Sequence, residues 1–195
     1  MGQIKSALEI ALERTETVKG DKDSISQFDA KQKGKKLAST FLAEGCDLAK
    51  EIKNTPEEQQ ESLKQGIFDV LITFISLPSA KDDEKRIENA GKGLQIVLND
   101  NHFAAIYKQF TQAISQFLKE TAQYDEAIRR QYAPKLRQKE EELSRRVGTA
   151  IRLDPFQDPE FVNFYNQNMN ALKANYAVIV DEVREEARRI FGQND

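Results

Sequence analysis

The most constraining feature of this sequence is the spacing of its apolar residues near the end of the chain. Seven of them follow one another at alternating steps of three and four: Val162, Tyr165, Met169, Leu172, Tyr176, Ile179 and Val183. Such steps align side chains on one face of an α-helix and, over three heptads, form a coiled-coil-like seam. Asp158-Pro159-Glu160 supplies a cap and first-turn residues. The pattern predicts a long helix over 159–191 that packs against another helix.

A second long helical pattern precedes it, over 101–151. Its apolar residues recur at helical spacing from Phe103 to Ile151. A continuous helix of this length would extend about 75 Å, whereas a globule of this size has a radius of gyration of about 16 Å. We therefore expect one of two outcomes. Either the helix breaks around Pro134, or it projects and needs a partner to cover its apolar stripe.

The clearest helix start lies at Thr55-Pro56-Glu57, where a hydroxyl cap precedes a proline at the first helical position. Apolar residues then dominate up to Leu77, and Pro78 follows. Because the run is apolar on nearly every side, we expect 57–77 to be the central core helix.

Three further helices are expected in the first half of the chain. The first starts at Ile4 and stops at Gly20-Asp21, and the second runs from a capping box at Ser24 to Asn54, with a potential break at Gly34. A fourth helix would be capped by Ser79 and end near Leu98. Its two glycines, Gly91 and Gly93, suggest close packing or a kink.

These elements predict an all-α protein, an antiparallel bundle of five to seven helices with two long C-terminal helices packed as a hairpin. Only 9 Gly and 5 Pro are available for turns, too few for a sandwich or barrel. We expect a single helical domain over 1–195, which could divide into a sub-bundle over 1–100 and a long helical hairpin over 101–195.

The residue types exclude most catalytic and metal chemistry. One His and one Cys cannot supply a zinc site, a di-iron bundle or a catalytic triad. Cys46, in an apolar context, is interpreted as a core residue, and His102 as a surface group. We expect no catalytic, cofactor-binding or metal-binding residue, no cofactor, and no enzymatic activity.

The best functional clue is a local charge asymmetry. The chain carries a formal net charge of -3, but the segment from Arg129 to Arg152 contains eight basic residues and only three acidic ones. This segment lies on the expected long helix, so it is either a solvated face or a docking site for an acidic partner. The candidate partner-binding residues are Arg129, Arg130, Tyr132, Arg137, Arg145 and Arg146.

Three function classes follow. The favoured one is a non-catalytic helical protein-protein interaction or scaffold protein, with a protein partner or a second copy of the chain as its ligand. The first alternative is a small-molecule or lipid carrier with a pocket between helices. The second is a nucleic-acid-associated factor acting through 129–152, although Tyr132 alone offers a ring for base stacking. We expect no membrane partner, because the apolar run in 57–77 is too short to cross a bilayer.

The start of the chain bears on its setting. Met1-Gly2 to Ser6 fits the pattern for myristoylation of Gly2, but so short a pattern arises easily by chance, and no signal-peptide run follows. Residues 4–15, with the sequence IKSALEIALERT, resemble the start of uncharacterised bacterial all-helical proteins of unknown function. The resemblance implies a bacterial cytoplasm and no particular activity, and the single Cys agrees with a reducing compartment.

Overall fold

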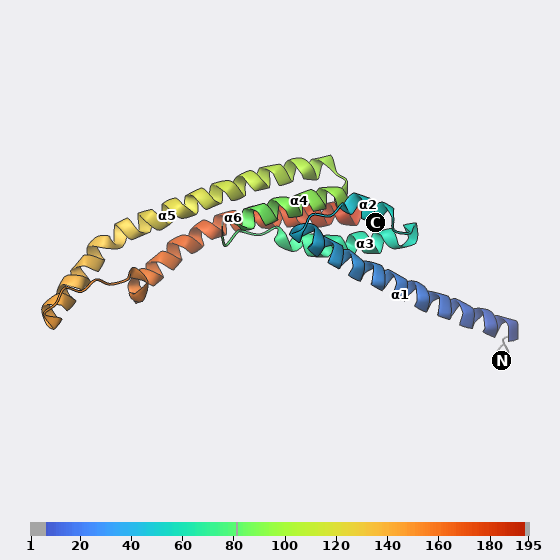
Figure 1. The fold of residues 1–195 in the computed structure, drawn as a ribbon, viewed down its shortest axis with the longest axis horizontal. Helices are drawn as coiled ribbons and strands as arrows, with labels where there is room; N and C mark the ends of the chain where they lie inside the picture. Colours follow the sequence, from blue (N-terminus) through green and yellow to red (C-terminus); the bar gives the residue numbers. More distant parts are fainter. Residues whose placement is uncertain (1–6, 81, 194–195) are drawn as a thin grey trace, which may run out of the picture. The chain divides into compact units, whose positions relative to one another are not determined.

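The computed structural model of this chain describes residues 7–80 and 82–193, with side chains from Asp23 onward. It contains α1 (Ala7–Ala43), α2 (Leu48–Lys53), α3 (Glu57–Leu71), α4 (Asp83–Leu98), α5 (Asn101–Val147) and α6 (Pro159–Gln193). Two short 3-10 helices, Ile72–Phe74 and Pro155–Gln157, complete the order (Figure 1). No strand occurs in the described ranges, so the predicted all-α bundle with two long C-terminal helices is confirmed. The residues that carry the resemblance (4–15) and the Gly2 pattern lie outside the residues whose side chains the structure describes.

The chain forms two compact units. Unit 1 contains Met1–Ile75, Arg86–Ala104 and Ala187–Asp195, and unit 2 contains Ser76–Lys85 and Ala105–Glu186. The division into a single domain, or into 1–100 and 101–195, stays a prediction.

The first helix of unit 1 is longer than expected. α1 runs without interruption through Gly20-Asp21 and through Gly34, so the predicted stop and the capping box at Ser24 are both wrong. It also ends at Ala43, well before Asn54, where Gly45 takes a positive φ of 76°. Asp47 then caps α2, its carboxylate accepting a hydrogen bond from the Lys50 N–H at 3.1 Å. Cys46 therefore lies in a turn between helices, not within one.

Glycines explain how α1 packs on α3. A Cβ at Gly34 would lie 2.1 Å from the Leu63 carbonyl oxygen, and a Cβ at Gly66 would lie 2.1 Å from the Lys31 carbonyl oxygen. The two helices therefore touch backbone to backbone, at a separation that no larger residue permits. Buried Ala30 and Ala38 lie one turn on either side of Gly34. The predicted weak point at Gly34 is instead a point of close contact between the helices.

α3 starts where the sequence predicts, but its cap differs. The N-cap is Pro56, and the Thr55 hydroxyl donates to the Glu51 carbonyl at 2.9 Å. The helix ends at Leu71, six residues before Leu77, since the chain tightens into the 3-10 turn and Ile75 leaves helical geometry at ψ 86°. Its core role within unit 1 holds: Leu63, Ile67 and Leu71 are fully buried.

α4 begins four residues after the expected cap. The Asp83 carboxylate accepts hydrogen bonds from the backbone N–H groups of Ser79 and Ala80, at 2.9 and 3.0 Å, so the acidic residue organises this turn. Within unit 1, Gly93 permits close packing, because a Cβ there would lie 2.5 Å from the Leu71 side chain.

In unit 2, α5 and α6 run side by side as an antiparallel hairpin (Figure 1). The ring of Phe117 meets Tyr176 at 5.1 Å and that of Tyr132 meets Phe161 at 5.2 Å. Both pairs are spaced by fifteen residues on each helix, so the register is constant between them. α5 passes through Pro134 as one helix and ends at Val147, where Gly148 takes a φ of 78°. α6 confirms the predicted long helix to within two residues.

Candidate functional site

The basic segment ends in a chain reversal that shapes the end of the hairpin. After Gly148 the backbone turns back along α5 and is held there by two side chains. The Ser144 hydroxyl oxygen accepts from the Ile151 N–H at 2.9 Å, and the Glu140 carboxylate accepts from the Leu153 N–H at 2.8 Å. Ile151 and Leu153 are half-buried, whereas Arg152 between them is exposed. The reversal therefore carries Arg152 back beside the last turns of α5.

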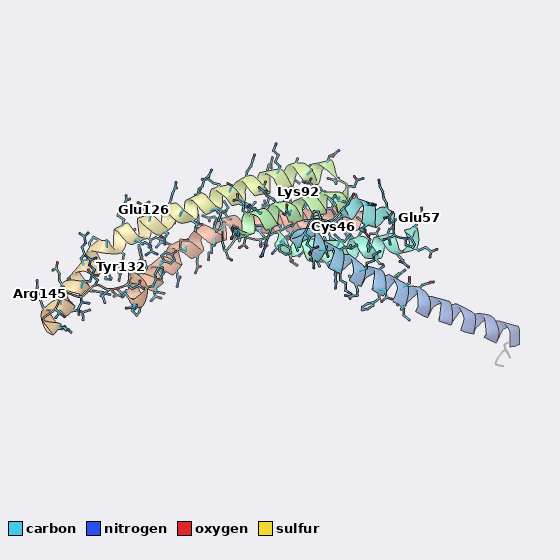
Figure 2. The ribbon with its side chains drawn as sticks, viewed as in Figure 1. Cys46, Glu57, Lys92, Glu126, Tyr132 and Arg145 are labelled. Carbon is cyan, nitrogen blue, oxygen red and sulfur yellow. The ribbon has the colours of Figure 1, made fainter. Side chains whose placement is uncertain are left out.

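A surface groove of about 480 Å³ results, which we call the arginine groove. It is lined by Arg137, Glu140, Glu141, Ser144, Arg145, Ala150, Ile151 and Arg152. Arg137 and Arg152 form no ion pair within the residues that the structure describes. Arg145, at the C-terminal end of α5 in Figure 2, lies 3.9 Å from Glu141, and both side chains are at least 70% exposed. The guanidinium groups are therefore largely available to a partner.

Arg146 belongs to a neighbouring groove of about 320 Å³. Leu143, Leu153 and Pro159 contribute apolar surface to it, and Lys139 and Asp158 lie along its edge. Arg146 therefore lines a different groove from the one lined by Arg137 and Arg145.

Tyr132 does not face solvent, contrary to its prediction as a partner-binding residue. It is 7% exposed, its ring packs on Phe161 and its hydroxyl donates to the Asp158 carboxylate at 2.8 Å. Burial, with that hydrogen bond, raises the pKa of Tyr132. The apolar spacing of α5 put Tyr132 on the seam, and the seam is buried by α6. Figure 2 shows it well before Arg145 along α5.

Asp158 is buried and is the centre of a polar cluster, which we call the Asp158 cluster, with buried Tyr132, half-buried Lys139 and the exposed side chains of Glu160 and Lys135. The Lys139 ammonium contacts both oxygens of Asp158, at 2.9 and 2.8 Å, and Glu160 at 2.5 Å. Lys135 pairs with Glu160 at 3.0 Å. Burial alone would raise the pKa of Asp158, but hydrogen bonds from Lys139 and Tyr132 more than offset it, so the pKa lies below its usual value.

The same contacts shift the pKa values of Lys139 and Glu160. Hydrogen bonds to Asp158 and Glu160 raise the pKa of Lys139, and hydrogen bonds from Lys139 and Lys135 lower the pKa of Glu160. Asp158, Lys139 and Glu160 therefore stay charged near neutral pH. A carboxylate whose charge is matched in this way joins α5 to the start of α6 and is a poor proton acceptor for catalysis.

Arg129 and Arg130 are paired within their own helix. Arg129 contacts Asp125 at 2.9 Å and lies over the Phe156 ring at 5.1 Å, and Arg130 contacts Glu126 at 2.5 Å. Both ion pairs are i,i+4 pairs, which the sequence spacing displays. These two arginines lie at least seven residues before Arg137 and do not line the arginine groove.

Sequence reasoning selected Arg137 and Arg145 but left Arg152 and Lys139 out of the candidate residues. Arg152 lines the groove only because the chain reverses at Gly148. Lys139 contacts Asp158, which lies nineteen residues later in the sequence. Asp158-Pro159 was readable as a helix cap, and the Asp158 carboxylate does accept the Glu160 N–H at 3.1 Å. Nothing in the sequence showed that the same carboxylate binds α5.

The remaining chemical candidates give no second site. Burial raises the pKa of the Cys46 thiol, whose sulfur donates to the Leu37 carbonyl at 3.7 Å. No group of three or more His, Cys, Asp or Glu side chains that could hold a metal is found among the residues described. Within those same residues, no helix is both long enough and apolar enough to span a bilayer.

Comparison with known proteins places most of the chain in a protein family. The model of a family of unknown function (DUF6657) matches residues 49–189. No curated protein and no solved structure matches the chain. The matched range contains all of α2 but Leu48, α3 to α5, most of α6, and both grooves at the end of the hairpin.

Proposed function

Since the chain belongs to this family of unknown function, we propose its function from its own surface: it is a non-catalytic helical protein that binds another protein through the end of the α5–α6 hairpin. The arginine groove is the proposed contact surface. The proposal keeps the favoured class of the sequence analysis and narrows its site from six residues to Arg137, Arg145 and the added Arg152.

The observation that carries the proposal is the contrast between two groups of charges in unit 2. In the Asp158 cluster, each charge is matched by an opposite charge at 3.0 Å or less. In the arginine groove, Arg137 and Arg152 have no such partner among the described residues. Charges that already pair with one another are less available to a partner, whereas arginine is enriched in protein interfaces.

The structure gives less support to the two alternatives. Nucleic-acid binding would benefit from a stacking ring, but Tyr132 is buried with its hydroxyl bound to Asp158. A small-molecule carrier needs a hollow that encloses most of its ligand. The two grooves described above are bordered by exposed charged side chains such as Arg146 and Arg152, not by the phenylalanines of the core.

Self-association is a separate part of the proposal. The stripe that motivated a homodimer is largely covered within unit 2, because Tyr132 is buried and Leu136, Leu143 and Ile151 are half-buried. Val147 remains 62% exposed. Size-exclusion chromatography with light scattering at micromolar concentration tests it, and a strict monomer would leave a different protein as the partner. The proposed setting is a reducing cytoplasm, where a single Cys stays a thiol.

The test compares two charge-reversed variants of the full chain. R137E/R152E alters the arginine groove, and K119E/K173E changes the net charge equally at exposed positions outside it. Each variant and the wild type is purified with its bound proteins from the cells that produce it, and candidates are then recombined as pure components. A protein that binds wild type and K119E/K173E but not R137E/R152E supports the proposal. Stoichiometric recovery of a small molecule or nucleic acid without any protein partner would overturn it.

A further inference from the structure

The arginine groove has a composition that selects for one kind of protein partner. We propose that it binds an acidic segment in which aspartate or glutamate residues alternate with aliphatic ones, their carboxylates pairing with Arg137 and Arg152. This inference rests on the proposed function and specifies the chemistry of its partner.

The two unmatched arginines indicate that the partner carries negative charge. Guanidinium groups bind carboxylates through two parallel hydrogen bonds, and they are less strongly hydrated than ammonium groups, so they lose less on contact. Arg137 comes from α5 and Arg152 from the returning chain, and both line the same groove. A peptide lying in the groove would therefore meet a guanidinium group from each wall.

The two glutamates of the groove limit how much negative charge it accepts. Three arginines and two glutamates line it, which leaves a net charge of about +1. Glu140 is engaged by the Leu153 N–H at 2.8 Å, and Glu141 lies 3.9 Å from Arg145. A chain with one phosphate per residue would bring its charges against Glu140 and Glu141, whereas spaced carboxylates avoid them.

The remaining lining residues favour aliphatic neighbours for those carboxylates. Half-buried Ile151 and exposed Ala150 contribute apolar surface, and no aromatic ring lines the groove. Aliphatic side chains next to an acidic residue would cover Ile151 while the carboxylate reaches Arg152. The absence of a ring from this lining removes the stacking contact that single-stranded nucleic acids use.

The test begins with a random twelve-residue peptide display library selected on the full wild-type chain. Recovered peptides are synthesised with a fluorophore, and their dissociation constants are measured by anisotropy against wild type, R137Q/R152Q and K119Q/K173Q. We expect the peptides to be enriched in Asp or Glu beside Leu, Ile or Val. We also expect R137Q/R152Q to weaken them about tenfold and K119Q/K173Q to weaken them less than about twofold. Circular dichroism melting confirms that the variants fold as wild type does.

Three outcomes would overturn the inference: peptides without acidic enrichment, peptides that bind R137Q/R152Q as tightly as wild type, or oligouridine RNA that binds more tightly than every peptide through the same arginines. Failure here is distinguishable from failure of the proposed function. A purified protein partner that binds through neutral or basic segments would refute the acidic-segment inference and leave the proposed function standing, whereas the absence of any protein partner refutes the function itself.

Discussion

The contact between α1 and α3 predicts a large effect for the smallest side chain that can be added there. Gly34→Ala would place a Cβ 2.1 Å from the Leu63 carbonyl oxygen, where real contacts stay above 3.0 Å. The oxygen belongs to the backbone of α3, so it cannot turn aside as a flexible side chain would. The helices must separate by about 0.9 Å, the difference between the two distances.

The change in the free energy of unfolding caused by Gly34→Ala is the difference between two opposing terms. Alanine is favoured over glycine within a helix by about 1 kcal/mol. Overpacking costs about 1–3 kcal/mol or more, and the separation also weakens the dispersion contacts of Ala30 and Ala38. We therefore expect Gly34→Ala to lower the free energy of unfolding by about 1–2 kcal/mol, which corresponds to a few degrees in Tm for a chain of this size.

The assay is urea unfolding followed by circular dichroism at 222 nm. Gly192→Ala is the matched control, because nothing lies within 4 Å of its added Cβ, and it should leave stability unchanged or slightly increased. Gly66→Ala should resemble Gly34→Ala, and the double variant should cost less than the sum, since one separation relieves both clashes. An unchanged or higher stability in Gly34→Ala would refute the backbone contact between the helices.

Five other substitutions test the remaining features of the structure. Lys139→Met should lower the free energy of unfolding in urea by about 1–3 kcal/mol, because it removes a partner of buried Asp158. Lys135→Met breaks an exposed pair and should lower it by at most about 1 kcal/mol. Equal losses in the two variants would contradict the Asp158 cluster. The lowered pKa of Asp158 adds stability that is present above the unfolded pKa of about 3.9 and is lost as the pH falls through the folded value. The acid limb of Tm against pH should therefore be shallower in Asp158→Asn, and an unchanged limb would contradict the shift. Thr121→Val should raise Tm and increase the free energy of unfolding by about 1 kcal/mol, because the Thr121 hydroxyl is buried with no hydrogen-bond partner among the described residues. A lower Tm would mean that the hydroxyl has a hydrogen-bond partner. Pro134→Ala should stabilise α5 by up to about 3 kcal/mol in calorimetry, since it restores a helical N–H, and no gain would show that the helix has adapted to the proline.

The two long C-terminal helices and the starts of α3 and α6 were predictable because their signals are local. The three-and-four spacing of 159–191 and the prolines at 56 and 159 depend only on neighbours within a few turns, and the structure places α3 and α6 accordingly. The i,i+4 partners of Arg129 and Arg130 follow from the same geometry.

The interruptions were not predictable, because they depend on energies from other elements. A glycine or proline inside a helix costs about 1–3 kcal/mol locally, and contacts with a neighbouring helix can exceed that. Gly34 is an example: read alone it weakens α1, yet opposite Leu63 it permits the close contact. The early end of α3 at Leu71 likewise has no local cause as strong as Pro78.

By itself the sequence determined that the chain is helical, where its two long C-terminal helices lie, and that basic residues outnumber acidic ones between Arg129 and Arg152. Only the tertiary structure decided which of those charges are exposed and which are matched. The reversal at Gly148 brings Arg152 beside Arg137, and the start of α6 brings Asp158 to Lys139. Periodicity describes a residue's face on its own helix, whereas a binding surface depends on which other segment lies opposite that face.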